Sequence, residues 1–386
     1  MLIKQKKTTT IRDKIKLTLI IYSLSSGGAE RVISILANYW AEKGWKITLL
    51  TLVSNQDIPF YKLDSRINQV ALGIAKESPN KIFGLWNNLN SIRILRSAIN
   101  QSQPDVVISF MDTVNVLTLL ATKGLNIPVL ISERNNPIKS CTEGIWTKLR
   151  KWTYPSADAI IVQTQRIQNY FQLQLQKRIL IIPNPVVLPS IARGKNLQTT
   201  CEKADKLLIA MGRLEEQKGF DLLLQAFAKL EDKYPQWKLV ILGEGSLRPQ
   251  LELLREQLEL TERIDLPGRV KNPHEYLQRA DLFVMSSRFE GFPNALCEAM
   301  ACGLAVISFD CPTGPREIIS HGRDGILVPN EDLPALTVAM ENLMSDEKER
   351  QRLASNAPKI VQRFNLESVA QKWEELIDKL AYSKVL

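Results

Sequence analysis

Short apolar segments alternate with amphipathic helical segments along almost the whole chain, and this alternation constrains the fold more than any other feature. Nearly continuous apolar strands that alternate with helices are typical of parallel sheets covered by helices on both faces. A helix is expected over Gly28–Lys43. The strands expected in the first half are Leu17–Tyr22, Lys46–Val53, Val106–Ser109, Val129–Ser132, Ala159–Val162 and Ile179–Ile182. Those expected in the second half are Lys206–Met211, Lys238–Leu242, Arg263–Leu266, Leu282–Met285, Ala305–Ser308 and Gly325–Val328.

A proline-rich segment, Pro183–Asn196, separates the two series of strands. The length of 386 residues is too great for one ordinary core and suits two domains of roughly 150–200 residues. We therefore predict an α/β fold of two Rossmann-like, doubly wound parallel-sheet domains, residues 1–190 and 191–365, facing each other across a ligand-binding cleft. A C-terminal helical segment, 366–386, either closes the second domain or crosses back to the first.

The beginning of the chain combines basic residues, an apolar stretch and small residues, as a secretory signal peptide does. The apolar stretch is short and β-branched, however, and it leads directly into a loop and an amphipathic helix. We interpret it as the first buried strand. No apolar run approaches the ~18 residues that span a bilayer, so we expect a cytoplasmic protein.

Cysteine and histidine usage argues against several kinds of site. The two histidines, His274 and His321, make a His-based metal site or a Ser-His-Asp triad hard to assemble. Reduced cytosolic thiols best explain five cysteines that lack metal-ligand spacing: Cys141, Cys201, Cys297, Cys302 and Cys311.

The net charge of +9 is unevenly distributed. Residues 1–195 hold 26 Lys/Arg against 11 Asp/Glu, whereas residues 196–386 hold 24 against 30. A first half at +15 and a second at −6 suggest that the first half meets a polyanion or an anionic membrane, unless it is merely a solvated basic surface. We expect no nucleic-acid partner, because neither stacking aromatics nor a basic recognition helix is apparent.

The most informative segment is SSRFEGFPNALCEAMACGLAVI, residues 286–307. A strand ends at Met285, a loop follows, and a helix begins near Asn294. Gly291 permits close backbone approach to a ligand, and the free N–H groups of the helix start suit a diphosphate. Glu298 is placed to accept hydrogen bonds from the vicinal hydroxyls of a ribose, and Glu290 to do the same for a sugar.

The chain at this point resembles glycosyltransferase family 4, whose hallmark is two glutamates separated by seven residues, here Glu290 and Glu298 in EGFPNALCE. The resemblance extends over nearly the whole chain. It implies a GT-B fold, transfer from a nucleoside-diphosphate sugar, UDP-sugar being favoured, and retention of anomeric configuration.

The segment IAMGRLEEQKGFDLLLQAF, residues 209–227, is similar to the strand-loop-helix with which the family grips the donor diphosphate. The resemblance assigns that grip to Arg213 and Lys218 and makes them, with Glu290, the catalytic set. Two fixed cations stabilise charge on a leaving diphosphate, so no metal or other cofactor is expected, and no Asp-x-Asp signature is present.

Further segments extend the resemblance. Gly243 and Gly245 lie in the family's glycine-rich turn, and Val270 lies where the base is usually held. In SSGGAER, residues 25–31, two glycines allow backbone amides to approach the donor, although a simple strand-to-helix turn would also explain them. The implied donor-binding residues are Gly27, Gly28, Arg213, Lys218, Gly243, Val270, Glu290, Gly291, Phe292, Asn294, Ala295, Leu296 and Glu298.

Polar residues follow two expected strands at the cleft edge: Asp112, Glu133, Arg134 and Asn135. Many family members carry a histidine in these loops, and this chain has none there. The Ser-Glu-Arg-Asn run resembles the branch that extends polyprenyl-diphosphate-linked oligosaccharides. Asp112 or Glu133 would orient the acceptor hydroxyl, or Glu133 and Arg134 would simply form an ion pair.

Two basic helices are candidates for acceptor or membrane contact. The first carries Arg93 and Arg96 beside an apolar stripe that consists of Leu85, Leu89, Ile92, Leu95 and Ile99. The second places Ile145, Trp146, Leu149 and Trp152 on one face and Lys148, Arg150 and Lys151 on the other. Such helices suit a membrane interface or a domain core equally well.

We therefore predict a metal-independent hexosyltransferase that takes a nucleotide-sugar donor and a lipid-linked or other glycan acceptor in cell-surface glycan biosynthesis. It would be peripheral at the inner face of the plasma membrane. A nucleotide-sugar 2-epimerase of the same fold and a non-catalytic sugar-nucleotide-binding subunit are the alternatives. The basic, Trp-bearing first half argues against the epimerase, and the complete set of glutamates and cations argues against the inactive subunit.

Overall fold

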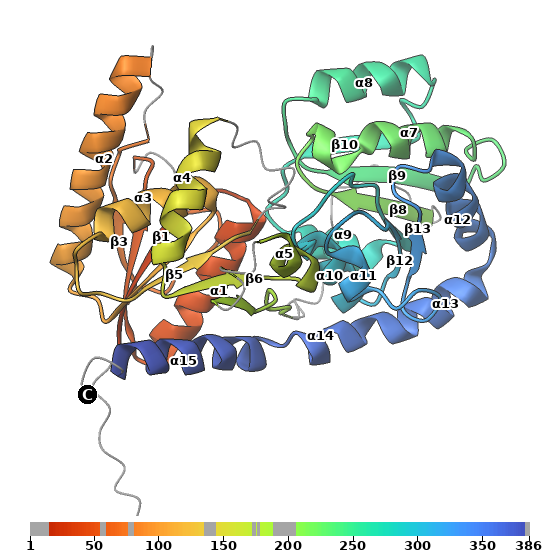
Figure 1. Cartoon of the computed structure of the whole chain (residues 1–386). Coiled ribbons are helices and arrows are strands. Elements are labelled where there is room, and N and C mark those ends of the chain that lie inside the picture. Colours follow the sequence, from red (N-terminus) through yellow and green to blue (C-terminus); the bar gives the residue numbers. More distant parts are fainter. Residues whose placement is uncertain are drawn as a thin grey trace, which may run out of the picture.

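The computed structural model describes residues 15–54, 59–75, 81–134, 144–171, 175, 178–187 and 206–382, with only the backbone described for 81–88. Figure 1 shows two α/β domains side by side, each built around a central sheet. In both sheets every pairing between neighbouring strands is parallel. The predicted architecture of two parallel-sheet domains is confirmed.

The first domain holds a seven-stranded sheet in the order β3-β2-β1-β4-β5-β6-β7. Its strands are β1 Lys16–Ile21, β2 Lys46–Thr51, β3 Asn68–Ala71, β4 Val106–Phe110, β5 Val129–Ser132, β6 Ala159–Val162 and β7 Ile179–Ile181. Its helices are α1 Gly28–Glu42, α2 Lys81–Ser102, α3 Asp112–Thr122, α4 Ile145–Thr153, the 3₁₀ helix η1 Tyr154–Ser156 and α5 Gln165–Tyr170.

The second domain holds a six-stranded sheet in the order β10-β9-β8-β11-β12-β13. Its strands are β8 Lys206–Met211, β9 Trp237–Leu242, β10 Ile264–Gly268, β11 Leu282–Met285, β12 Ala305–Phe309 and β13 Ile326–Val328. Its helices are η2 Glu216–Lys218, α7 Phe220–Ala228, α8 Arg248–Gln257, α9 Pro273–Arg279, α10 Asn294–Ala301, α11 Pro315–Ile318 and α12 Leu333–Ser345. The chain continues through α13 Glu347–Asn356, η3 Ala357–Lys359, α14 Ile360–Arg363 and α15 Leu366–Tyr382.

One strand was not predicted from the sequence. β3 pairs with β2 at the edge of the first sheet, and its four residues, NQVA, are exposed or half-buried. The central strands β4, β5 and β6 are buried throughout and therefore read as apolar runs, whereas an edge strand need not.

The last helix packs against the first domain, although it follows the second domain in sequence. In Figure 1, α13, α14 and α15 run beneath both domains in a nearly continuous path. Val369, Ala370, Trp373 and Ile377 of α15 lie in the same apolar cluster as β1 and β4. The Trp373 ring stacks on Phe110 with centroids 6.2 Å apart and meets the edge of Trp40 at 6.4 Å. Aromatic burial of this kind attaches α15 to the first sheet.

In the two basic helices, α2 and α4, the buried and exposed side chains differ from the predicted apolar and basic faces. Leu95 and Ile99 of α2 are buried, but Leu89 is 49% exposed, and the side chain of Leu85 lies outside the described residues. In α4, Trp146 and Leu149 pack against the core, whereas Ile145 is 63% and Trp152 is 60% exposed. Arg150, expected on the basic face, is buried. No helix among the described residues is long and apolar enough to cross a membrane.

Candidate active site

The carboxyl ends of the two sheets carry most of the predicted site residues, and contacts between the domains there include the following two. The Asn294 side chain, at the start of α10, donates from Nδ2 to the Gly28 carbonyl at 3.1 Å. Arg31 of α1 forms an ion pair with Glu298 of α10 at 2.6 Å. The loop that opens α1 therefore faces the helix of the two glutamates, as ligand binding between doubly wound domains requires.

Lys218 and Glu290 form an ion pair beside this contact. Their Nζ and Oε1 atoms are 2.6 Å apart, and both side chains are largely buried. Arg213, just after β8, donates to Gln217 at 3.3 Å, and within the described ranges this one hydrogen bond uses only part of the donor capacity of its guanidinium. The arrangement brings two cations and one carboxylate to the end of β8, and charges in such a site act strongly on a bound diphosphate.

Glu298 is a buried residue of α10, and its carboxylate pairs with a residue of the first domain. Its Oε1 accepts from Arg31, and its Oε2 has no hydrogen-bond partner among the described residues. Burial raises the pKa of Glu298, and the Arg31 charge opposes that shift. His274 of α9 lies 3.3 Å from the same guanidinium, and burial, followed by the Arg31 charge, lowers its pKa to about 4. His274 is therefore neutral at pH 7 and accepts this hydrogen bond at Nε2.

The remaining donor-side residues contribute mainly backbone. Gly243 has a φ of 149°, and a Cβ there would collide with the Gly212 carbonyl, so only glycine permits these two loops to approach. The side chains of Phe292 and Leu296 pack in the core of the second domain, and Val270 packs against its edge. Gly291 and Ala295 flank them at the start of α10. Since none of these side chains is polar, backbone N–H and C=O groups are the polar groups that these positions can offer a ligand.

Glu30 was not singled out from the sequence but lies inside the site. Its carboxylate folds back over Gly27 and accepts from Ser23 at 3.5 Å and Ser25 at 3.4 Å. Burial raises the pKa of Glu30, while the nearby charge of Arg213 acts in the opposite direction. An acidic group thus lies over the glycine loop, within the electrostatic range of Arg213.

Glu133 does not face the cleft directly, because it is fully buried behind the end of β5. Its Oε2 accepts from the Tyr154 hydroxyl at 2.6 Å, and Asn115 donates to that hydroxyl at 3.3 Å. Burial, with a smaller effect from the Asp112 charge, raises the pKa of Glu133 to about 7. Asp112 is also buried and accepts from the Thr113 N–H at 2.8 Å, at the start of α3. Asp112 is 8% exposed, whereas Glu133 is not exposed at all.

The Glu133–Arg134 ion pair that the sequence left open does not form. Arg134 instead donates from Nη1 to Asn184 and places its guanidinium 4.3 Å from the Phe110 ring centroid. Asn184 in turn donates to Asn294 Oδ1 at 2.7 Å. Arg134, Asn184, Asn294 and the Gly28 carbonyl therefore form one hydrogen-bonded series across the cleft. Asn184 is a second residue that sequence reasoning missed, although it lies in the proline-rich segment Pro183–Asn196.

The structure separates Arg93 and Arg96 from the other predicted acceptor-side residues. Arg96 donates to the carbonyls of Ala121 and Lys123 at 2.8 Å each, at the end of α3 opposite Asp112. Arg93 is exposed on the same helix, which covers the outer flank of the first domain in Figure 1. Asn135 lies outside the described residues.

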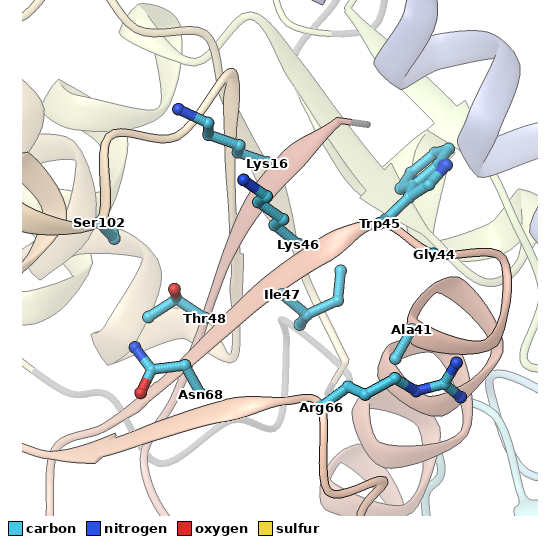
Figure 2. A pocket seen from close by; sticks show the side chains of 10 residues that line it. All are labelled: Lys16, Ala41, Gly44, Trp45, Lys46, Ile47, Thr48, Arg66, Asn68 and Ser102. Carbon is cyan, nitrogen blue, oxygen red and sulfur yellow. The ribbon is translucent and has the colours of Figure 1, made fainter. Parts of the chain in front are cut away.

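A cavity of about 550 Å³ lies at the amino ends of the first sheet. Figure 2 shows Lys16 and Lys46 extending side by side from the starts of β1 and β2, with Trp45 and Arg66 at the other side. These residues lie at the amino ends of their strands, whereas the two glutamates follow the carboxyl end of β11 in the second sheet. The cavity is therefore separate from the candidate active site.

Comparison with known proteins identifies the family. The model for Glycosyltransferase Family 4 matches residues 26–188, and the model for Glycosyl transferases group 1 matches residues 197–360. A Campylobacter jejuni protein is 30% identical over 94% of this chain and 98% of its own length. The chain belongs to glycosyltransferase family 4. That relative is named as an α-1,4-N-acetyl-D-galactosaminyltransferase of GalNAc-α-(1→4)-GalNAc-α-(1→3)-diNAcBac-PP-undecaprenol.

Solved structures of other proteins have the same fold as this glycosyltransferase. Sucrose-phosphate synthase from Thermosynechococcus elongatus matches with a TM-score of 0.83 over 96% of this chain and 100% of its own, at 20% identity. A mutant of S. aureus TarM, solved with fondaparinux, α-GlcNAc-glycerol and UDP, matches with a TM-score of 0.76 over 94% and 100%, at 15% identity. The expected GT-B fold and glycosyltransferase activity are confirmed, in preference to the epimerase and the inactive subunit.

Proposed function

We propose that this glycosyltransferase moves a hexosyl or N-acetylhexosaminyl unit from a nucleoside-diphosphate sugar, UDP-sugar being favoured, to a lipid-linked oligosaccharide or other glycan, with retention. The observation that carries the proposal is the convergence of Arg213, Lys218, Glu290 and Glu298 opposite the Gly27–Gly28 loop. The printed activity of the Campylobacter relative supports a lipid-linked acceptor in cell-surface glycan biosynthesis. The UDP in the TarM structure supports the base.

In this proposal each charged group has one task. Arg213 and Lys218 hold the diphosphate and stabilise the charge that grows on it as its bond to the sugar C1 breaks. The Glu298 carboxylate accepts from ribose hydroxyls. Glu290, held by Lys218, contacts the transferred sugar, and Asp112 lies on the acceptor side.

We further propose that no metal is required. The described residues contain no group of three or more His, Cys, Asp or Glu side chains that could hold a metal ion. Two protein cations would serve the leaving diphosphate instead. Transfer from a UDP-sugar should therefore proceed at an undiminished rate in EDTA. Loss of turnover on chelation, with recovery in Mn²⁺, would contradict the role given to Arg213 and Lys218.

The two glutamates should fail in different ways. Glu298→Gln should weaken UDP binding severalfold, because ribose contacts exist equally in the ground and transition states. Glu290→Gln should lower kcat more than it lowers UDP affinity. Isothermal titration with UDP and steady-state kinetics separate the two effects. Wild-type UDP affinity in the Glu298 variant would refute the ribose assignment.

Membrane contact is the last element of the proposal. The exposed face of α4 combines two apolar side chains, Ile145 and Trp152, with two lysines, Lys148 and Lys151. A helix face of this composition binds anionic lipid surfaces through both charge and apolar insertion. Together with the +15 of residues 1–195, this face supports a peripheral location at the inner leaflet, where a lipid-linked acceptor would be reached.

A further inference from the structure

Arg31 contacts the candidate active site from the first domain. The roles proposed above for the two glutamates and for the cations Arg213 and Lys218 do not include it. Its Nη1 lies 2.6 Å from Glu298 Oε1, and its Nη2 lies 3.3 Å from His274 Nε2. Its side chain is only 18% exposed. One guanidinium therefore joins α1 of the first domain to α9 and α10 of the second.

Glu298 has a specific need for such a partner. The side chain is 9% exposed, and its second oxygen, Oε2, is buried without a hydrogen-bond partner among the described residues. A buried carboxyl group without a counter-charge takes up a proton, because a low-dielectric environment disfavours the ion. A protonated Glu298 would offer fewer acceptor sites to two ribose hydroxyls than the carboxylate does.

We propose that Arg31 is a positioning residue that keeps Glu298 ionised and orients it toward the ribose, so that one domain completes the nucleotide site of the other. This inference rests on the proposed donor site. Its consequence is that nucleotide affinity depends on a residue outside the nucleotide-binding domain. It also predicts a distinctive pH dependence when Arg31 is removed.

Other ionisable groups around Glu298 would not produce that dependence. They are Arg31 on α1, Tyr61 before β3, His274 on α9, Cys297 on α10 itself and Cys302 directly after α10. Burial, followed by Arg31, lowers the pKa of His274 to about 4, while burial raises the pKa of Cys302 to about 11 and that of Tyr61 to about 12. Burial also raises the pKa of Cys297. Removing the Arg31 charge raises the pKa of Glu298 further, whereas burial still keeps the pKa of His274 below its ordinary value and those of the two thiols and Tyr61 above theirs.

The test is UDP affinity, with GDP in parallel, measured by isothermal titration from pH 6 to 9. Arg31→Met should bind UDP more weakly than the wild type does. This loss of affinity should be largest at low pH. The ratio of the two Kd values should shrink as the pH rises, by at most about tenfold per pH unit for one proton. Taking this ratio cancels the titration of the nucleotide itself.

Matched variants separate this role from a merely structural one. Arg31→Lys retains the charge and should restore most of the affinity. Glu298→Gln cannot ionise, so adding Arg31→Met to it should leave the UDP affinity and its pH profile unchanged. Lys43→Met removes a cation directly after the far end of α1, which pairs with Glu374 at 2.8 Å, and should behave as wild type. Thermal melts establish that each variant is folded, and Arg31→Lys provides the test if Arg31→Met is not.

Three results would overturn the inference. Tighter UDP binding by Arg31→Met would mean that Arg31 competes with the ribose. An equal loss at every pH, or a loss that persists in the Glu298→Gln background, would mean that Arg31 contacts the nucleotide itself. Unchanged binding would remove its role altogether. If the wild type binds neither UDP nor GDP, the proposed donor site fails instead.

Discussion

Glu133 and Tyr154 form a polar pair that solvent does not reach. The carboxyl group is fully buried, and its Oε1 has no hydrogen-bond partner among the described residues. The sequence indicated that Asp112, Glu133 and Arg134 end neighbouring strands, but it could not indicate their partners. Tyr154 and Asn184 lie 21 and 50 positions away from Glu133 and Arg134 along the chain, and only the sheet order brings them together.

Glu133→Gln should make the first domain relatively more stable as the pH rises. Burial raises the pKa of Glu133 from 4.5 to about 7, so the folded state holds its proton more tightly than the unfolded state. Wild-type stability should therefore fall between pH 4.5 and about 7, by about 3 kcal/mol at most, whereas the glutamine does not titrate. Urea unfolding at pH 5 and pH 8 measures this difference.

Tyr154→Phe provides a second variant for the same measurement. The tyrosine hydrogen bond lowers the pKa of Glu133, so its removal should steepen the loss of stability with pH. Parallel pH profiles for the wild type and Glu133→Gln would show that the carboxyl group is not held protonated.

Among the elements, the buried strands were the most predictable and the amphipathic helices the least. Twelve of the thirteen strands in the described part of the chain were expected, and the exception, β3, carries no apolar run because it lies at an edge. In α4 the sequence predicted the apolar stripe, but it did not predict that one part of the stripe is buried and the other exposed. Trp146 turns inward to the core and Trp152 outward, since the packing of α3 and α4 rather than periodicity decides which part is covered.

The exposed face of α4 should bind anionic vesicles. Lys148→Glu with Lys151→Glu should reduce co-sedimentation with phosphatidylserine-containing liposomes, because each basic side chain contributes about 1 kcal/mol near such a surface. Trp152→Ser should reduce the part of the binding that resists salt, since apolar insertion is not screened.

The control for this experiment makes the same charge change elsewhere. Lys229→Glu with Lys359→Glu alters two exposed lysines of the second domain and should leave liposome binding almost unchanged. Equal loss in both double variants would show that net charge, and not this helix, governs the association. UDP binding should be normal in all of them.

At the scale of the whole molecule, the sequence predicted the two domains but not the contacts between them. The sequence predicted two domains and the residue groups at their facing edges, including Arg213, Lys218 and the two glutamates. It could not predict the electrostatic effect of Arg213 on Glu30, or the contacts that Arg31 and Asn184 make with the second domain, because each depends on how two separately folded sheets meet. SSGGAER contained two of these residues, but its glycines were the only part with a recognisable backbone role.

The Asn184–Asn294 hydrogen bond should help to hold the domains together. Asn184→Ala and Asn294→Ala each break the series from Arg134 to Gly28, and each lost hydrogen bond should cost about 0.5–1.5 kcal/mol. We expect a larger radius of gyration by small-angle X-ray scattering and a raised KM for both substrates. Asn356→Ala, which alters a hydrogen bond within α13, is the control.

The double variant of Asn184 and Asn294 shows whether the two residues act together. Because they share one hydrogen bond, the effects should be less than additive. Fully additive effects on the radius of gyration would mean that the two residues act separately.

The path of α15 also has a meaning for biosynthesis. All strands of the first sheet have been synthesised once β7 is complete, yet the surface that Trp373 and Ile377 cover stays exposed until almost 200 further residues have been made. At ordinary elongation rates this interval is roughly 10–40 s. The domain that is translated first is thus finished last, and Trp40 and Phe110 await their packing partner throughout synthesis of the second domain. A nascent chain that stalls in this interval would present an apolar surface to chaperones.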